Sequence, residues 1–207
     1  QQQQFVADAS HELRTPLAVV SSNAELLLRH PDHTIEEESQ RVTNIVREAR
    51  RMTKLVADLL TLARSDANQT EINLGPVSVK DLLTNMASQF APLAEMQGLT
   101  LELQAEEDAE LMADRERLDQ LLHILLDNAL KYTPPPGRIT LGAAKQGNSV
   151  LITVEDTGVG IPAVDLPRVF DRFYRGDKAR TRKHGGTGLG LAIAKWIVER
   201  HGGRIRV

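Results

Sequence analysis

A histidine and a carboxylate stand side by side near the start of the chain, as His11 and Glu12, and Thr15 follows one helical turn later. Residues three or four apart share a helix face, so these polar side chains can project to one side of a helix. Imidazole is a nucleophile and a base near neutral pH, and a neighbouring carboxylate can take its proton. The pattern therefore indicates acid–base or nucleophilic chemistry, although solvated helix faces carry such pairs too.

A helix from residue 1 to about residue 29 is expected to position this group. Its apolar residues recur every three or four positions, which is the spacing of one helix face. These residues are Val6, Ala9, Leu13, Leu17, Val20, Ala24 and Leu27. His11 lies off this stripe and should face solvent. Pro16 lies inside the helix, where we expect a kink because proline removes a backbone donor.

A second long helix is expected after the turn at His30–His33, starting with Thr34 as its N-cap and ending near Asp66. Its apolar spacing is close to the 3.5-residue period of a coiled coil. The residues of this stripe are Val42, Ile45, Ala49, Met52, Val56, Leu59 and Ala63. Two helices alone would leave apolar surface exposed. We therefore predict a homodimer in which two hairpins, each formed by residues 1–67, close a four-helix bundle.

The pattern changes after a polar, turn-rich linker at residues 68–76. Short alternating segments at Val77–Val79, Leu99–Gln104, Leu111–Ala113, Ile139–Ala144 and Val150–Glu155 predict strands. Longer periodic segments predict helices at Lys80–Gln97 and Asp114–Lys131. This mixture, without strict alternation, predicts an α+β sandwich in which helices cover one sheet.

Three further groups of residues suit a nucleotide and a metal ion. Asn128, on a strongly apolar helix, offers an amide oxygen, and Mg²⁺ prefers oxygen ligands. Asp156–Pro162 follows a strand, and its glycines let the backbone approach a ligand closely. Gly185–Gly190 places bare N–H groups at the start of a helix that runs to about Arg200, which is a natural phosphate site. Taken singly, each group could also be an ordinary turn or helix end.

Together these residues resemble the motifs of the HisKA-type sensor histidine kinases of bacterial two-component systems. Ser10–Leu17 (SHELRTPL) is similar to the H box, Leu125–Thr133 to the N box and Asp156–Pro162 to the first glycine box. Phe170–Arg175 (FDRFYR) is similar to the F box, and Gly185–Ile193 to the second glycine box. The five motifs follow the family's order and cover nearly the whole chain, so the resemblance is specific.

The resemblance implies an α+β protein of two domains. Residues 1–67 would be the dimerisation and histidine-phosphotransfer hairpin, and residues 77–207 an ATP-binding domain of the Bergerat (GHKL) fold. The basic segment at residues 176–186 would be the lid over the triphosphate. The implied activity is autophosphorylation of His11 from ATP and Mg²⁺, followed by transfer to an aspartate on the receiver domain of a response regulator.

The resemblance also implies a role for each matching residue. Glu12 would be the general base for His11, and Thr15 would position a water for phosphatase activity towards the regulator. Asn128 would hold Mg²⁺, and Asp156 would accept a hydrogen bond from the adenine amino group. The other nucleotide-binding residues would be Lys131, Tyr132, Gly158, Gly160, Arg175, Gly186, Thr187, Gly188, Leu189 and Gly190.

One position departs from the family pattern. Many members have a second asparagine four residues before the Mg²⁺ ligand, where this chain has Ile124. The related gyrase and MutL-type ATPases have a glutamate there that activates water, and isoleucine cannot act as a general base. We therefore expect slow hydrolysis by this domain alone. The alternative function is a non-catalytic, nucleotide-binding dimeric docking module for a regulator, and the sequence leaves open whether a protomer phosphorylates itself or its partner.

The composition excludes several other classes of protein. The 207 residues suit one large domain or two small ones, and a net charge of −3 gives no argument for a nucleic-acid partner. The absence of cysteine excludes disulfides and thiolate metal sites. No apolar run is long enough to span a membrane. The family resemblance implies that the chain is the cytoplasmic portion of a bacterial protein that is anchored to the membrane only through upstream segments. We read the chain as a piece of a longer protein that stops within a strand at Arg204–Val207.

Overall fold

The computed structural model describes most of the chain, namely residues 2–66, 71–105, 109–147, 149–176 and 186–207. Residues 67–70, at the start of the predicted linker, and residues 177–185, in the predicted lid, lie outside the described residues. Within the described ranges, no helix is both long enough and apolar enough to cross a membrane.

The chain divides into two compact units. The first, called the hairpin unit here, combines Gln1–Gln69 with Arg172–Leu189. The second, the sheet unit, combines Thr70–Asp171 with Gly190–Val207. The segment Arg172–Leu189 therefore groups with the helices although it interrupts the sheet unit in the sequence. The predicted domain boundaries, after residues 67 and 76, stay a prediction.

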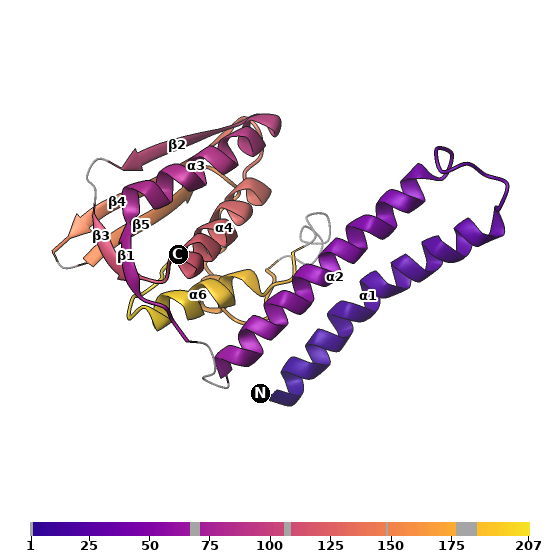
Figure 1. Ribbon diagram of the computed structural model, residues 1–207, viewed down its shortest axis with the longest axis horizontal. Coiled ribbons are helices and arrows are strands. Elements are labelled where there is room, and N and C mark those ends of the chain that lie inside the picture. The colour runs from indigo at the N-terminus through magenta and orange to yellow at the C-terminus, as the bar shows by residue number, and fades with distance from the viewer. Residues whose placement is uncertain (1, 67–70, 106–108, 148, 177–185) are drawn as a thin grey trace. The chain divides into compact units, whose positions relative to one another are not determined.

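Two long helices, α1 (Gln2–Arg29) and α2 (Ser39–Asp66), form the helical hairpin and lie side by side in Figure 1. Helix α1 continues through Pro16, as the unbroken apolar period predicts. Leu55 and Leu62 of α2 are buried, with 2% and 1% of their surface exposed. The predicted helical hairpin is therefore confirmed.

The start of the second helix differs from the prediction. Thr34 makes the expected cap contacts, because its N–H donates to Oε2 of Glu37 at 2.7 Å and its hydroxyl oxygen accepts the Glu37 N–H at 3.3 Å. However, residues 35–38 form turns and the helix begins at Ser39. The backbone and side-chain hydrogen bonds from Thr34 hold the pKa of Glu37 below its usual value.

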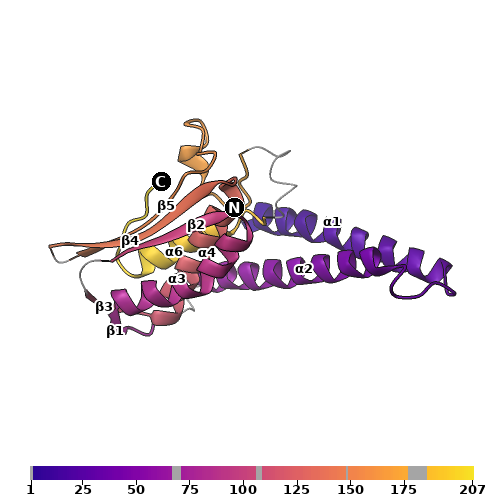
Figure 2. The same ribbon diagram turned by 90° about the horizontal axis from the view of Figure 1, so that it is seen from above.

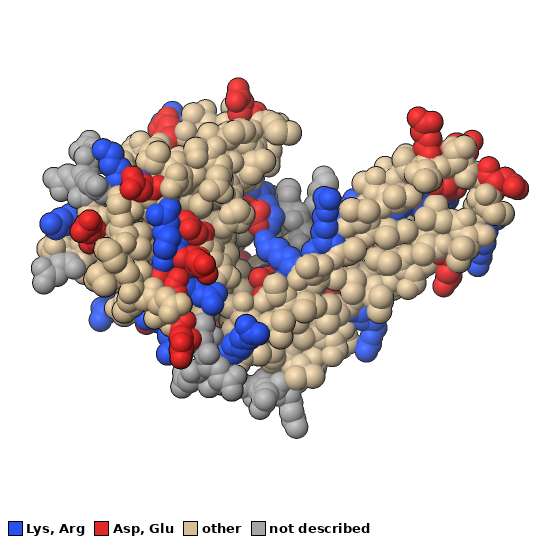
Figure 3. All heavy atoms as spheres, in the orientation of Figure 1, with Lys and Arg blue, Asp and Glu red and all other residues tan. Residues whose placement is uncertain are grey.

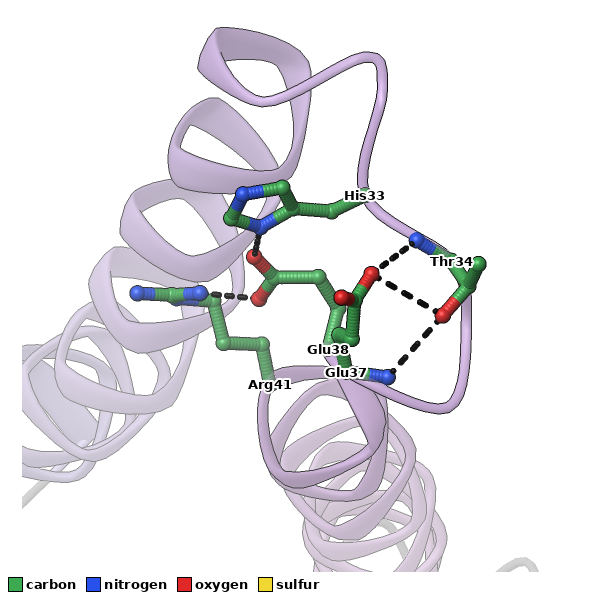
Figure 4. A network of polar contacts seen from close by, with 5 residues as sticks. All are labelled: His33, Thr34, Glu37, Glu38 and Arg41. Carbon is green, nitrogen blue, oxygen red and sulfur yellow. Dashed lines mark hydrogen bonds and ion pairs between the residues drawn. The ribbon is translucent and has the colours of Figure 1, made fainter.

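Glu38 turns inward beneath this turn, which explains why the helix starts late (Figure 4). One of its carboxylate oxygens pairs with Nδ1 of His33 at 2.7 Å, and the other accepts from Arg41. These two hydrogen bonds hold the pKa of Glu38 below its usual range, and only 5% of the residue is exposed. A buried carboxylate needs such partners, so Glu38 anchors the turn between the two helices.

The sheet unit follows the predicted order of strands and helices, with bounds close to those expected. Its elements are β1 (Gly75–Ser78), α3 (Val79–Met96), β2 (Leu99–Ala105), β3 (Glu110–Ala113), α4 (Arg115–Tyr132), β4 (Gly137–Gln146), β5 (Ser149–Asp156), a 3₁₀ helix (Leu166–Arg168) and α6 (Gly190–Arg200). Residues 203–207 form no strand, so the expected strand at Arg204–Val207 is wrong.

The strands form two sheets rather than the single sheet expected. In the larger sheet β4 is central, parallel to β2 and antiparallel to β5, so that Ile139 lies opposite Leu101. Strands β1 and β3 pair with each other instead, antiparallel. Helices α3, α4 and α6 lie on one side of the larger sheet in Figure 2. The predicted α/β sandwich is confirmed with this correction.

The core of the sheet unit lies between these helices and β4. Its largest fully buried side chains are Leu82 and Leu83 of α3, Leu122 and Leu126 of α4, Ile139 and Leu141 of β4, and Ile193 and Ile197 of α6. At roughly 25 cal/mol per Å² of apolar surface removed from water, this burial is the main stabilising term. The helix that carries Asn128 is thus fixed by packing on its opposite face.

Candidate active site

The three polar residues of the first motif lie on α1 as the sequence predicts. His11 and Thr15 are exposed, and Glu12 is half-buried. His11 faces solvent, as its place off the apolar stripe of α1 predicts. The imidazole is therefore open to a reactant, while the neighbouring carboxylate is partly withdrawn from water.

Two guanidinium groups hold the Glu12 carboxylate. Nη2 of Arg51, from α2, lies 3.6 Å from Oε2, and Nη1 of Arg175, from the F-box segment, lies 3.6 Å from Oε1. The Arg175 side chain is only 17% exposed, and its Nε and Nη2 atoms are buried without a hydrogen-bond partner among the described residues. Unpaired buried N–H groups on a cation are costly, so Arg175 is suited to receive an anion.

A backbone hydrogen bond joins the residues on either side of the predicted lid. The N–H of Phe173 donates to the Gly188 carbonyl at 2.9 Å. A Cβ on Gly188 would lie 2.9 Å from the Phe173 backbone, and Gly188 has φ +72°, so only glycine fits there without strain. Phe173 itself has φ 60°, which is uncommon for a residue with a side chain.

The F-box segment also contacts the first turn of α1 and the last residue of α2. Arg172 makes two hydrogen bonds to the carboxylate of Asp66, at 2.8 and 2.6 Å, which hold the pKa of Asp66 below its usual value. The Phe5 ring lies 5.9 Å from the Phe173 ring. Phe170 and Phe173 of the F box are both half-buried.

The second glycine box spans the two units. Gly186, Thr187, Gly188 and Leu189 belong to the hairpin unit, and Gly190 opens α6 in the sheet unit. Thr187 is buried, and its hydroxyl donates to Oδ2 of Asp58 at 3.3 Å. Leu189 is fully buried. These side chains anchor the end of the predicted lid.

The N-box residues lie on the last turns of α4. Asn128, Lys131 and Tyr132 are all half-buried. The Nζ atom of Lys131 pairs with Oδ2 of Asp127 at 2.7 Å, an i,i+4 pair on the helix face. Lys131 is therefore oriented by a carboxylate of its own helix.

The first glycine box folds back on the end of α4. Oδ1 of Asp156 accepts the N–H of Gly158 at 2.8 Å, and the N–H of Val159 donates to the Tyr132 carbonyl at 3.2 Å. A Cβ on Gly158 would lie 2.5 Å from both Oδ1 of Asp156 and the Tyr132 carbonyl oxygen, so no side chain fits. Gly160 follows with φ +67°. The structure thus brings Tyr132, Asp156 and Gly158 together.

The departure from the family pattern has a packing explanation. A Cβ on Gly190, at the start of α6, would lie 3.2 Å from Cγ2 of Ile124. An apolar side chain suits this close approach between α4 and α6. Ile124 therefore packs against the second glycine box instead of offering a ligand or a base.

Three acidic residues of the site were not singled out by sequence reasoning. Asp58 and Asp66 reach partners more than 100 residues away in sequence, and no local pattern signals such contacts. Glu48 could have been found, because it lies three residues after Ile45 and four before Met52, on the apolar stripe of α2. A carboxylate on an apolar stripe indicates a buried, paired charge.

The donor set fits a metal that is shared with phosphates. Among the described residues, no three His, Cys, Asp or Glu side chains gather into a metal-binding group. Mg²⁺ commonly binds through few protein oxygens together with substrate phosphates and waters. Asn128 can supply such an oxygen, and the unpaired N–H groups of Arg175 suit a phosphate.

Two protein-family models match this chain and together define its class of protein. Residues 1–68 match the family model of the His Kinase A (phospho-acceptor) domain. Residues 113–207 match the model of the histidine kinase-, DNA gyrase B- and HSP90-like ATPases. The chain belongs to the two-component sensor histidine kinases and comprises their catalytic core.

Particular relatives agree with this class. Sensor histidine kinase YkoH of Bacillus subtilis is 42% identical over 202 residues, which is 97% of this chain and 43% of the relative. Sensor histidine kinase WalK of the same species is 37% identical over 207 residues, 99% of this chain and 34% of the relative. The chain therefore spans less than half of the length of these relatives.

Solved structures share the fold. Histidine kinase AdeS of Acinetobacter baumannii superposes with a TM-score of 0.74 at 25% identity, covering 91% of this chain and 86% of that one. Full-length ShkA in complex with AMPPNP gives a TM-score of 0.68 at 29% identity, covering 95% and 40%. Both cover the hairpin and the ATPase fold, so the two-domain architecture is confirmed.

Proposed function

We propose that this chain is an autokinase core in which His11 is the phosphoryl acceptor. One nitrogen of its imidazole attacks the γ-phosphorus of ATP in line, a nitrogen–phosphorus bond forms, and the bond to the β,γ-bridging oxygen breaks as ADP leaves. Glu12 accepts the proton from the other ring nitrogen, which keeps the attacking nitrogen nucleophilic. One observation carries this proposal: His11 is exposed beside a carboxylate that lies 3.6 Å from Arg175.

Positioning and charge neutralisation supply most of the rate in phosphoryl transfer. Mg²⁺, held by Asn128 with phosphate oxygens, would neutralise charge on the triphosphate. Lys131 and Arg175 would contact phosphate oxygens, and Asp156 would select adenine by accepting from its amino group. The glycines of both boxes, together with Thr187 and Leu189, would keep the backbone close to the nucleotide. Tyr132 would pack near the nucleoside.

The proposed onward partner is the receiver domain of a response regulator, whose aspartate takes the phosphoryl group from His11. Thr15 is exposed one turn after Glu12, where it could orient a water for the reverse task, dephosphorylation of that regulator. Thr15→Ala should then lower the rate of regulator dephosphorylation and spare autophosphorylation. Loss of both activities together would contradict the role of Thr15.

The test of the proposed function is incubation with γ-labelled ATP and Mg²⁺, beside a His11→Gln variant. Label that is acid-labile, alkali-stable and absent from the variant would support a histidine autokinase with His11 as acceptor. Absence of label, with nucleotide still bound, would instead favour the non-catalytic docking module.

A further inference from the structure

Five charged side chains of alternating sign connect α2, α1 and the F-box segment. Nε of Arg47 lies 3.3 Å from Oε1 of Glu48, whose Oε2 lies 3.7 Å from Nη1 of Arg51. The other terminal nitrogen of Arg51, Nη2, lies 3.6 Å from Oε2 of Glu12. The series ends with Nη1 of Arg175, which is 3.6 Å from Oε1 of the same Glu12 carboxylate. All five residues belong to the hairpin unit.

Arg51 occupies the middle of this series and is held in place from its own helix. Glu48 is 9% exposed, and a buried carboxylate requires a cation or several donors. Arg51 supplies one of these from the next turn of α2, and its side chain is 27% exposed. Because the guanidinium is planar and its donors are fixed relative to one another, anchoring Nη1 on Glu48 also directs Nη2 towards Glu12.

The two oxygens of the Glu12 carboxylate are divided between the two arginines. Arg51 contacts Oε2 and Arg175 contacts Oε1. A general base for His11 needs one oxygen free to accept a proton and must hold a fixed orientation while it does so. If Arg175 turns to a phosphate, Oε1 becomes free while Oε2 stays held.

We propose that Arg51 is a positioning residue for the phosphorylation of His11. It holds Oε2 of Glu12, so that Oε1 is presented to the imidazole proton when Arg175 engages the nucleotide. Arg51 touches neither the nucleotide nor the reacting atoms, and it acts only through Glu12. This inference rests on the proposed role of Glu12 as the base.

The chain offers a matched control for its test. Arg50 precedes Arg51 on α2, carries the same charge and is exposed. Arg51→Gln should lower kcat for autophosphorylation by about tenfold, a fraction of the roughly 10² to 10⁴ that a general base contributes. The KM for ATP should stay unchanged, and the pH profile of the rate should change shape. Arg51→Lys should recover part of the rate, and Arg50→Gln should behave as the wild-type chain does.

Two outcomes of these kinetics would overturn the positioning role. One is an equal rate in Arg51→Gln and Arg50→Gln. The other is a loss in Arg51→Gln that Arg51→Lys does not recover and that comes with a lower thermal midpoint, because that combination marks a purely structural contact.

A second measurement separates this inference from the proposed kinase activity. Diethyl pyrocarbonate carbethoxylates neutral imidazole nitrogens without any nucleotide, and peptide mass mapping gives a rate for each histidine. In an Arg175→Gln background, where Oε1 of Glu12 is free without nucleotide, adding Arg51→Gln should make His11 react several-fold more slowly relative to the exposed His123 of the same chain, because its base is no longer held. Arg50→Gln should leave that ratio unchanged. Equal ratios in both variants overturn the positioning role, whereas a wild-type chain that takes no label from ATP overturns only the kinase activity.

Discussion

Helices α1 and α2 and the sheet unit differ in how they bury apolar side chains. Among the large aliphatic side chains described in α1 and α2, only Leu55 and Leu62 are fully buried, whereas α4 alone buries Leu118, Leu121, Leu122, Leu126 and Leu130. The hairpin leaves Leu17, Val56 and Leu60 between 43% and 52% exposed. Its face in Figure 3 is largely free of charged side chains between its two ends.

The difference indicates which unit is complete by itself. A helix pair with an apolar stripe on its outer face needs another surface to cover it, whereas the sheet unit closes its own core. A second copy of the hairpin fits this need, which supports the proposed homodimer. The two units should therefore respond differently to the same kinds of substitution.

The largest effect is expected in the core of the sheet unit. Leu122 is fully buried, so Leu122→Ala should lower the free energy of unfolding by about 2–5 kcal/mol. The only tryptophan of the chain, Trp196 on α6, is 9% exposed and reports this unfolding by fluorescence in denaturant. Val56→Ala, at an exposed hairpin position, should leave the Trp196 transition unchanged. Similar shifts in both variants would remove the contrast between the units.

The next effect concerns association rather than folding. Val56→Asp should weaken the proposed dimer at least about tenfold in Kd, because a charge would enter an apolar bundle interface at a cost of more than 1.4 kcal/mol. Sedimentation equilibrium measures this change, with Arg50→Gln as the control. A wild-type chain that is already monomeric at micromolar concentration would contradict the four-helix bundle.

A smaller effect is expected at the N-cap of α4. The carboxylate of Asp114 accepts the N–H groups of Asn73 and Arg117, at 3.0 and 3.1 Å, and the Asp114 N–H donates to Nε2 of His201 at 3.0 Å. Asp114→Ala should therefore lower the stability of the sheet unit by about 1 kcal/mol. The Trp196 transition measures the loss, and an unchanged midpoint would show that the cap contributes nothing.

Asp114 also makes the stability of the sheet unit depend on pH, and the direction of this dependence can be derived. Burial raises the pKa of Asp114, but the hydrogen bonds from Asn73 and Arg117 outweigh it, so the pKa is lower in the folded chain than in the unfolded one. The ionised form then favours folding. This contribution is complete above the unfolded pKa of about 3.9 and is lost as the pH falls through the lower folded value. The difference in stability between wild type and Asp114→Ala should shrink over that acidic range and be constant at neutral pH.

The smallest effect is expected at the hairpin turn. Thr34 is exposed, and its hydroxyl caps only Glu37. Thr34→Ala should lower the free energy of unfolding of the hairpin by about 0.5 kcal/mol, at the low end for a cap residue, because water can replace the lost hydrogen bond. Circular dichroism of the helices would show the shift, and the Trp196 transition should not move. A cost as large as that of Leu122→Ala would mean that the turn controls the whole fold.

The local elements could be predicted from the sequence because their signals are local. The apolar period of α1 continued past Pro16, and a strongly apolar periodic segment started at Asp114, so both helices were predicted with nearly correct bounds. The start of α2 was not predicted correctly, because it depends on the side-chain contacts of Glu38. Glu38 binds His33 and Arg41, while Thr34 still makes its cap contacts with Glu37.

The sequence predicts which residues form the candidate site, and those roles stay predictions, but it does not predict the contacts between the residues. Motif spacing pointed to His11, Asn128 and Asp156, and the exposure of His11 followed from its place off the apolar stripe. The guanidinium of Arg51 on Glu12 joins residues 39 positions apart on different helices. Such contacts depend on how two helices pair, which no short pattern encodes.

The backbone bond from Phe173 to Gly188 has a consequence for tolerance of insertions. This bond holds the two ends of the intervening chain together. The contact at Phe173 and Gly188 therefore offsets the entropy cost of bringing those ends together. For a flexible connection between two fixed points, each doubling of its length costs only about 0.6 kcal/mol more. Protein engineers could therefore insert an epitope or a small domain between Gly176 and Gly186 with little loss of stability, provided that Gly188 is kept.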